Sequence, residues 1–176
     1  MEVSDAVRVR KSVRAYDSKD IPEDVLARIL EAGRLSPSAN NSQPWHFIIV
    51  KDAEKRMALS KRTWTKFLTE SPVVIVGCGD RKKAEKWYVI DVSIALQTMV
   101  LTATSEGIGT CWIGDFDEDR VRELCKIPEN LKVVCLLALG YPREKFDLSR
   151  AVTGGKRRKP LSDIVSFEEF GKSEPR

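Results

Sequence analysis

The longest apolar segment of the chain runs from Tyr88 to Glu106 and reads Tyr-Val-Ile-Asp-Val-Ser-Ile-Ala-Leu-Gln-Thr-Met-Val-Leu-Thr-Ala-Thr-Ser-Glu. One row of apolar residues recurs along it at helical spacing and comprises Val89, Val92, Leu96, Met99, Val100 and Ala103, and a second row comprises Ile90, Ile94 and Leu101. A helix on the surface of a globular protein needs only one apolar face, so two rows predict a helix that is buried on opposite sides. We expect a sheet to cover one side and a second subunit, or else the rest of a monomeric core, to cover the other.

Three shorter apolar runs are typical of β-strands and lie at residues 47–50, 73–76 and 133–139. The last two are apolar at nearly every position, which predicts central strands covered on both faces. Helical patterns alternate with these runs, at residues 1–10, after Pro22 and at residues 53–60, the last with Asp52 as its cap. This alternation predicts an α+β or α/β layered domain.

The composition is that of a soluble globular protein, with 42% hydrophobic and 32% charged residues among 176. We expect one domain over residues 1–176, located in the cytoplasm and without membrane contact, because no apolar run reaches the roughly 20 residues that cross a bilayer and residues 1–5 do not resemble a signal peptide. The four cysteines form no Cys-x-x-Cys pair and are expected to be structural. His46 is the only histidine, which excludes a multi-histidine metal site within one subunit, and we expect it to be structural.

The net charge of +4 is concentrated in two basic clusters, Arg8-Val9-Arg10-Lys11-Ser12-Val13-Arg14 and Lys156-Arg157-Arg158-Lys159. Neither cluster is interleaved with aromatic residues or belongs to a recognisable nucleic-acid module. They could converge on one small anion or form ordinary solvated faces. If the first cluster is extended, Arg10, Ser12 and Arg14 project to one side, where arginine's rigid donor fork suits a phosphate or a polar ring.

A second polar segment, residues 36–47, reads Ser-Pro-Ser-Ala-Asn-Asn-Ser-Gln-Pro-Trp-His-Phe and leads into a strand. Amide side chains both donate and accept hydrogen bonds, so this loop could recognise the edge of a planar heterocycle. The alternative is a turn-rich loop whose hydrogen bonds are satisfied internally. A competing motif, Gly77-Cys78-Gly79-Asp80, has Lys82 where a dinucleotide fingerprint needs its third glycine, so we expect those glycines to serve close packing.

Five segments, in order, resemble the signatures of the nitroreductase family: residues 10–14, 36–47, 91–97, 107–114 and 156–161. Each is a weak match alone, but together they cover the chain nearly end to end. The resemblance implies an α+β, nitroreductase-like fold with a central, mixed but mostly antiparallel sheet flanked by helices and a long central interface helix. It also implies a homodimer that holds FMN non-covalently between its subunits.

Matching positions give the phosphate site of the implied FMN. Arg10 and Ser12, with Lys11 between them, would hold the phosphate and the ribityl chain. Lys156 and Arg158 would complete the phosphate site, which would explain the second basic cluster without nucleic acid.

The resemblance also implies roles around the flavin ring. Arg14 would lie against the pyrimidine side of the ring, and Asn41 would hydrogen-bond its edge. Gly114 and Asp115 would place backbone groups near flavin N5, so these two residues and Arg14 would serve the chemistry. The partner subunit would contribute Pro37, Ser38 and Ala39.

The implied activity is that of an oxidoreductase in which hydride passes from NAD(P)H through flavin N5 to a nitroaromatic, quinone or similar acceptor by a ping-pong cycle. A fixed cation such as Arg14 would favour the negative charge that reduction places on the ring. Alternatives are a non-enzymatic flavin-binding or redox-sensing protein, and a family member with dehalogenating or flavin-fragmenting activity. Only residues 63–70 stand where larger relatives carry substrate-covering insertions, and Trp64 among them could line the ring face or belong to the core.

Overall fold

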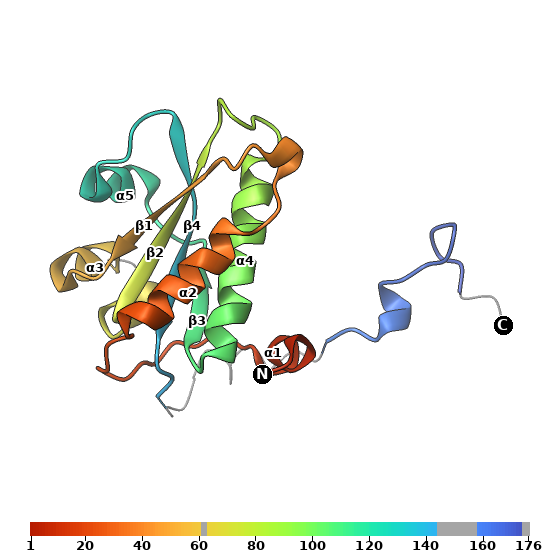
Figure 1. Ribbon diagram of the computed structural model, residues 1–176, viewed down its shortest axis with the longest axis horizontal. Helices are drawn as coiled ribbons and strands as arrows, with labels where there is room; N and C mark the ends of the chain where they lie inside the picture. Colours follow the sequence, from red (N-terminus) through yellow and green to blue (C-terminus); the bar gives the residue numbers. More distant parts are fainter. Residues whose placement is uncertain (61–62, 144–157, 174–176) are drawn as a thin grey trace. The chain divides into compact units, whose positions relative to one another are not determined.

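The computed structural model describes residues 1–60, 63–143 and 158–173, in two compact units that span residues 1–145 and 146–176 (Figure 1). In the second unit, the described residues form a 3-10 helix, η3 (Leu161–Asp163), followed by a turn in which Gly171 N–H donates to Ser166 Oγ over 2.9 Å. All of its described residues are exposed, so none of these residues forms an apolar core.

The first unit is built on a four-stranded sheet in the order β1-β2-β4-β3, with antiparallel neighbours. Its strands are β1 (Trp45–Val50), β2 (Val73–Asp80), β3 (Gly109–Ile113) and β4 (Leu131–Gly140). The two strands predicted to be central, β2 and β4, are central and buried on both faces. The predicted α+β class is confirmed, and the one parallel pairing among the described residues is an isolated bridge between Ser12 and Thr110.

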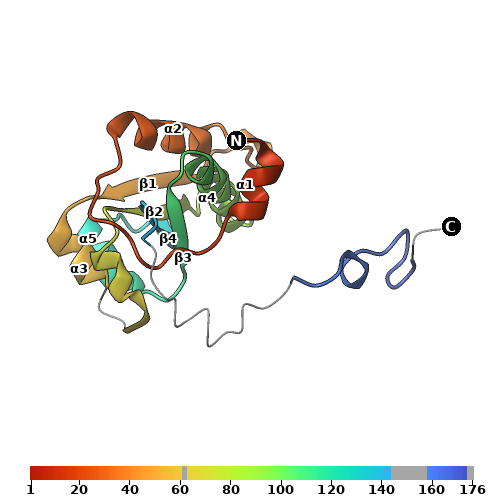
Figure 2. The same cartoon turned by 90° about the horizontal axis from the view of Figure 1, so that it is seen from below.

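Helices cover both faces of this sheet (Figure 2). On one face lie α2 (Glu23–Arg34) and α4 (Tyr88–Ser105), and on the other lie α3 (Ala53–Leu59), η2 (Thr63–Thr69) and α5 (Glu118–Cys125). Successive residues of a strand point to opposite faces. Accordingly, Val73 and Ile75 pack against α2 and α4, whereas Val74 and Val76 pack against the second layer.

One prediction about helix ends, at Asp52, is confirmed, and one, at Pro22, is adjusted. Asp52 caps α3, because its Oδ1 accepts the Lys55 N–H over 2.8 Å. Pro22 precedes α2 as its N-cap instead of occupying the first turn. Gly33 lies inside the last turn of α2 and not beyond it, where a Cβ would stand 2.0 Å from Met99 Cε, so glycine allows α2 and α4 to approach closely.

The glycines after Val76 serve packing, as the sequence predicted. Gly77 and Gly79 lie within β2 and not in a turn that leads into a helix. A Cβ at Gly77 would stand 2.8 Å from Leu96 Cδ1, and one at Gly79 would stand 2.6 Å from Tyr88 Cδ2. Both glycines therefore bring β2 close to α4.

The two faces of α4 differ sharply in exposure. The inner face is fully buried against the sheet through Val92, Ala95, Leu96, Met99, Val100 and Ala103. On the outer face, Ile90 is 47% exposed and Ile94 38% exposed. Val89, assigned from the sequence to the buried row, is 46% exposed at the first turn of the helix. We call Ile90 and Ile94 the outer face of α4, beside which Val89 is also exposed.

By length and composition alone, α4 is also the one helix among the described residues that is long and apolar enough to cross a membrane. With 18 residues, α4 is shorter than the roughly 20 residues that the sequence analysis took as the length needed to cross a bilayer. The buried inner face of α4 is that of a core helix packed on a sheet.

Candidate functional site

The basic segment at residues 10–14 is extended and fixed to the edge of the sheet. It leaves α1 (Val3–Val9) at Arg10, and Val13 N–H donates to Thr110 O over 2.8 Å. Val13 is buried, whereas Ser12 and Arg14 on either side of it are exposed. This alternation confirms the extended geometry on which the common orientation of the polar residues depends.

A buried tyrosine anchors this segment, a role that the sequence did not reveal. Tyr16 is 2% exposed, and its hydroxyl donates to Val13 O over 2.6 Å. Burial raises the pKa of Tyr16 well above its ordinary value, so the hydroxyl stays protonated and remains a donor. Arg143 N–H donates to Ala15 O over 3.0 Å, one residue beyond the basic segment. The basic side chains thus extend from a backbone held at both ends.

The polar loop at residues 36–43 has an unusual backbone. Asn40, Asn41 and Gln43 all have positive φ, at 51°, 53° and 45°. Asparagine tolerates this left-handed region better than most residues, and glutamine does so less readily. Gln43 N–H donates to Ser38 Oγ over 2.9 Å, and Gln43 Nε2 donates to Asn41 Oδ1 over 3.0 Å. These internal hydrogen bonds agree with the turn-rich alternative and leave the amide nitrogen of Asn41 to donate to a ring edge.

A buried carboxylate ties this loop to the start of α4. Asp91 is 2% exposed in the first turn of α4, and its Oδ1 accepts the Ala39 N–H over 3.1 Å. A negative charge is favourable at the amino end of a helix. Its Oδ2 is buried without a hydrogen-bond partner among the described residues. A buried oxygen without a hydrogen-bond partner lowers the stability of the fold. We infer that Asp91 is kept despite this cost because its other oxygen positions the loop through Ala39.

The segment after β3 presents open backbone. Gly114 and Asp115 are exposed directly after the strand ends at Ile113. A Cβ at Gly114 would meet no described atom within 4 Å, and its φ is not positive, so neither crowding nor backbone conformation within the chain requires glycine. The space above its backbone suits the close approach of a flat ring. The residues therefore fit the group that the resemblance implies: cationic donors at residues 10–14 and bare backbone at Gly114.

Two groups of predicted site residues lie at opposite ends of α4 (Figure 1). The segment 10–14 pairs with Thr110, just beyond the end of the helix, whereas the loop 37–41 contacts Asp91 at its start. The helix has 18 residues, which corresponds to about 27 Å. One chain therefore does not bring these two groups together.

Four further residues were singled out in the sequence. Arg158 lies in the second unit and is exposed, whereas Lys156 and the side chain of Trp64 lie outside the described residues. His46 is exposed on β1, and the described residues contain no cluster of side chains that could hold a metal.

The cysteines are buried thiols. Cys78, Cys111 and Cys135 are buried and Cys125 is partly buried. Burial raises the pKa of Cys78 to about 12 and that of Cys135 to about 11, which makes both poor nucleophiles at neutral pH.

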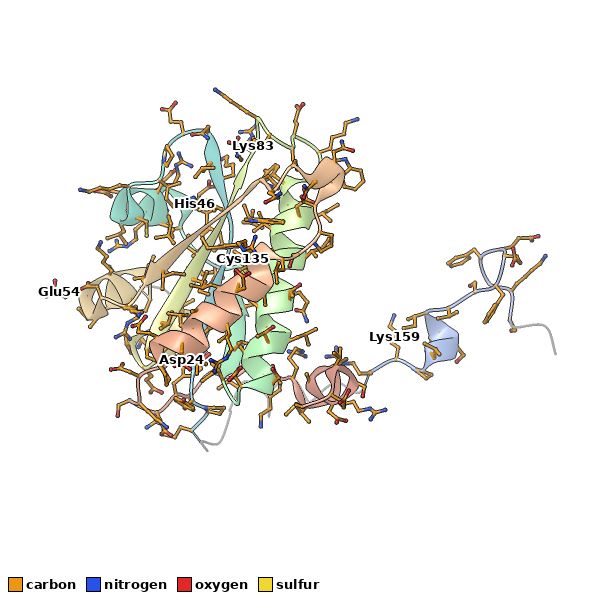
Figure 3. All side chains as sticks on the ribbon, in the orientation of Figure 1. Asp24, His46, Glu54, Lys83, Cys135 and Lys159 are labelled. Carbon is orange, nitrogen blue, oxygen red and sulfur yellow. The ribbon has the colours of Figure 1, made fainter. Side chains whose placement is uncertain are left out.

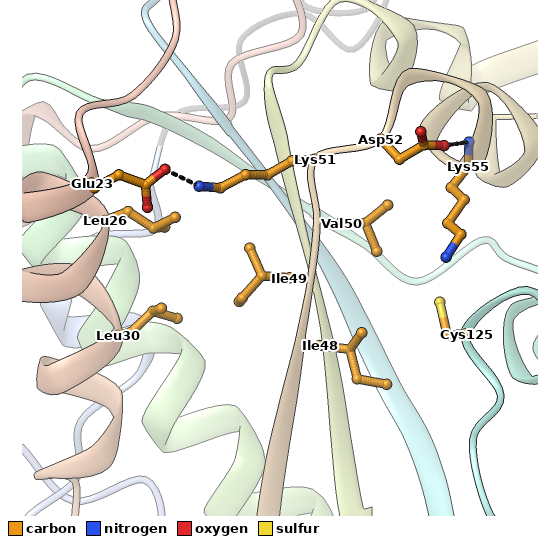
Figure 4. A pocket seen from close by; sticks show the side chains of 10 residues that line it. All are labelled: Glu23, Leu26, Leu30, Ile48, Ile49, Val50, Lys51, Asp52, Lys55 and Cys125. Atoms are coloured by element: carbon orange, nitrogen blue, oxygen red, sulfur yellow. Dashed lines mark hydrogen bonds and ion pairs between the residues drawn. The ribbon is translucent and has the colours of Figure 1, made fainter.

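A groove of about 500 Å³ lies elsewhere, along the edge strand β1 (Figure 4). Its lining residues are Glu23, Leu26, Leu30, Ile48, Ile49, Val50, Lys51, Asp52, Lys55 and Cys125. Lys51 closes one side through an ion pair with Glu23. None of the predicted site residues lines this groove, so it is separate from the two polar groups beside α4.

Comparison with known proteins identifies the family of this chain. The model of the nitroreductase family matches residues 7–74 and 53–141, which include the segment 10–14, the loop 36–43 and Gly114. The chain belongs to the nitroreductase family. A family relative from Archaeoglobus fulgidus, named provisionally as an NADH dehydrogenase/NAD(P)H nitroreductase, is 37% identical over 153 residues, which cover 82% of this chain and 88% of the relative.

A solved structure extends this likeness to three dimensions. An FMN-dependent nitroreductase from Clostridium difficile R20291 is 29% identical and superposes with a TM-score of 0.80 over 94% of this chain and 98% of its own. A more distant nitroreductase-family relative, the iodotyrosine deiodinase of Hydra vulgaris, is 24% identical over 196 residues, which cover 91% of this chain and 70% of the relative. The same architecture therefore supports more than one chemistry among its relatives.

Proposed function

We propose that this chain is an FMN-dependent oxidoreductase that acts as a homodimer and holds each FMN between two subunits. The observation that carries the proposal is the separation of the two polar groups along α4. In a two-fold dimer with antiparallel α4 helices, the start of one helix lies beside the end of the other. The loop 37–41 of one subunit would then meet the segment 10–14 of its partner.

The outer face of α4 supports this arrangement. Val89, Ile90 and Ile94 are large apolar residues exposed together on one helix. Apolar residues clustered in this way mark contact surfaces more often than solvated ones. Burial of this face against a second copy would satisfy the second apolar row of the helix.

Arg10, Lys11 and Ser12 would hold the FMN phosphate, because charge-assisted hydrogen bonds to phosphate oxygens are strong. Lys156 and Arg158 would add cations to the same phosphate. Arg14 would stand on the pyrimidine side of the ring as a fixed positive charge.

When bound, FMN supplies reversible two-electron chemistry, taking a hydride from NAD(P)H at N5 and delivering the electrons to a nitroaromatic, quinone or similar acceptor in a ping-pong cycle. The exposed backbone at Gly114 and Asp115 would line the N5 side of the ring. Arg14 would stabilise the negative charge near N1 and O2, and the internally bonded loop 37–41 would shield the ring edge from water. The acceptors are small molecules, and the proposed location is the cytoplasm.

The decisive experiment is an absorption spectrum of the purified protein, followed by release and identification of the chromophore. Oxidised-flavin bands and free FMN are expected, and a colourless protein that takes up no added FMN would refute the proposal. Stopped-flow mixing with NADH and NADPH then tests for an enzyme. A flavin that neither nucleotide reduces would instead indicate the non-enzymatic, redox-sensing alternative.

The deiodinase relative favours dehalogenation as a second candidate reaction. Incubation of the reduced protein with a halogenated phenol and with a nitroaromatic would compare the two directly. Release of halide faster than reduction of the nitro group would favour the second candidate.

A further inference from the structure

A basic loop precedes α4 and takes no part in the site described above. It comprises residues 81–86, Arg-Lys-Lys-Ala-Glu-Lys, whose four cations and single carboxylate give a net charge of +3, compared with +4 for the whole chain. Its charged side chains are all exposed. Among the residues that the structure describes, none of its cations forms an ion pair. The loop is therefore an exposed concentration of positive charge in the first unit, in addition to residues 8–14.

The backbone of the basic loop is held in place by Asp80. The Oδ1 atom of Asp80 accepts N–H groups from Lys82 over 2.8 Å and Lys83 over 3.4 Å, and its Oδ2 accepts from Asn130 Nδ2 over 3.2 Å. The lysine side chains are therefore presented from a fixed turn and not from a freely moving segment.

The basic loop lies at the same end of α4 as the polar loop. Asp80 N–H donates to Pro44 O over 2.8 Å, so the residue before the basic loop is hydrogen-bonded to the residue after the polar loop. Lys83 lies at the end of the sheet where α4 begins (Figure 3). In the proposed dimer this end faces the partner's segment 10–14, so the basic loop would stand at the rim of the partner's FMN site.

We propose that the basic loop binds the 2′-phosphate of NADPH and makes NADPH the preferred electron donor. This inference rests on the proposed function. The FMN phosphate would already be bound by the cations at residues 10–14. Quinones and nitroaromatics need no anionic group. The nicotinamide dinucleotide is therefore the remaining anion that must reach the flavin ring. Its adenosine half extends away from the nicotinamide, and the 2′-phosphate is the one group that NADH lacks. Cations at the rim would therefore separate the two donors.

The test compares kcat/KM for NADPH and NADH in the FMN-loaded protein and in the double variant K82Q/K83Q. The double variant K55Q/K66Q is the matched control, because it removes the same charge from exposed lysines on α3 and η2. A cation about 4 Å from a phosphate charge in water contributes roughly a factor of five. We expect the wild type to prefer NADPH at least tenfold, and K82Q/K83Q to lose about 10- to 25-fold with NADPH, mainly through KM.

The remaining measurements distinguish failure of this inference from failure of the proposed function. We expect NADH efficiency to fall less than threefold in K82Q/K83Q and both donors to be unaffected in the control, with FMN content and dimer mass unchanged. This inference would be overturned by equal kcat/KM for both donors in the wild type, or by equal losses for both donors in K82Q/K83Q. Either result would leave the proposed function unaffected. Absence of reduction by either donor would overturn the proposed function together with it.

Discussion

The outer face of α4 offers the sharpest test of the dimer. The double variant Ile90→Ala/Ile94→Ala removes the two exposed isoleucines and leaves the buried inner face of the helix untouched. We expect the variant subunit to fold normally, because neither side chain contributes to the core. We also expect it to dissociate at concentrations at which the wild type remains paired, and to lose FMN as it does so.

The size of the expected change in dimer affinity follows from the exposed fractions of the two isoleucine side chains. Ile90 is 47% exposed and Ile94 38% exposed, so together they leave about 0.85 of one isoleucine in water, and complete burial of one such side chain contributes about 1.5–3 kcal/mol. Two-fold symmetry doubles this contribution, to roughly 2.5–5 kcal/mol per dimer as an upper limit. The dimer dissociation constant should therefore rise by about two to three and a half orders of magnitude.

Sedimentation velocity across a dilution series, with flavin absorbance recorded alongside protein absorbance, measures both quantities at once. Met57→Ala, which removes an exposed apolar side chain from α3, is the control and should change neither. A variant that stays dimeric and flavin-loaded at every concentration would refute the assignment of this face. So would a wild-type protein that is monomeric and still binds FMN.

Further predictions concern single residues. Arg14→Ala should weaken FMN binding or lower the flavin potential, as equilibrium titration and spectroelectrochemistry would show, and unchanged values for both would remove its assigned role. Gly33→Ala should lower the free energy of unfolding by about 1–3 kcal/mol in urea, since its Cβ would displace Met99; an unchanged midpoint would mean that Met99 rearranges at no cost. Asp91→Asn should speed proteolysis within the loop 36–43 and weaken FMN binding together, because it weakens the bond to Ala39, and equal cleavage rates would count against it. Cys78 has a folded pKa of about 12 against an ordinary value of 9.0, so its contribution to stability is present below pH 9 and is lost as the pH rises toward 12. Iodoacetamide at pH 8 should label this thiol in urea but not in the native protein, and rapid native labelling would contradict its burial.

The elements that the sequence predicted well are those whose composition alone requires burial. The runs at 73–76 and 133–139 are apolar throughout and became the central strands β2 and β4. By contrast, β3 has only five residues, begins at Gly109 and forms a strand because β4 pairs with it. Similarly, α5 is mostly charged with Val121 as its only buried residue, so local pattern gave little indication of a helix.

The candidate site also has features that depend on local sequence and features that depend on distant contacts. For residues 10–14 only a conditional prediction was possible: if this segment is extended, its alternate residues project to one side, because side-chain direction in a strand is a local property. The roles of Tyr16 and Asp91 depend on partners at Val13 and Ala39, and only Tyr16 has its partner nearby in the sequence. The separation of the two polar groups along α4 could not be read from the sequence at all, since it depends on which end of a helix each loop returns to.

That separation has a genetic consequence in the proposed dimer. Each flavin site would take its phosphate cations from one polypeptide and its polar loop from the other, so a defect in the segment 10–14 and a defect in the loop 37–41 would fall in the same site when carried on different chains of one dimer. Two inactive alleles of this kind, expressed together, should form mixed dimers in which one site is doubly damaged and the other is fully intact. Two alleles damaged in the same segment should never complement each other.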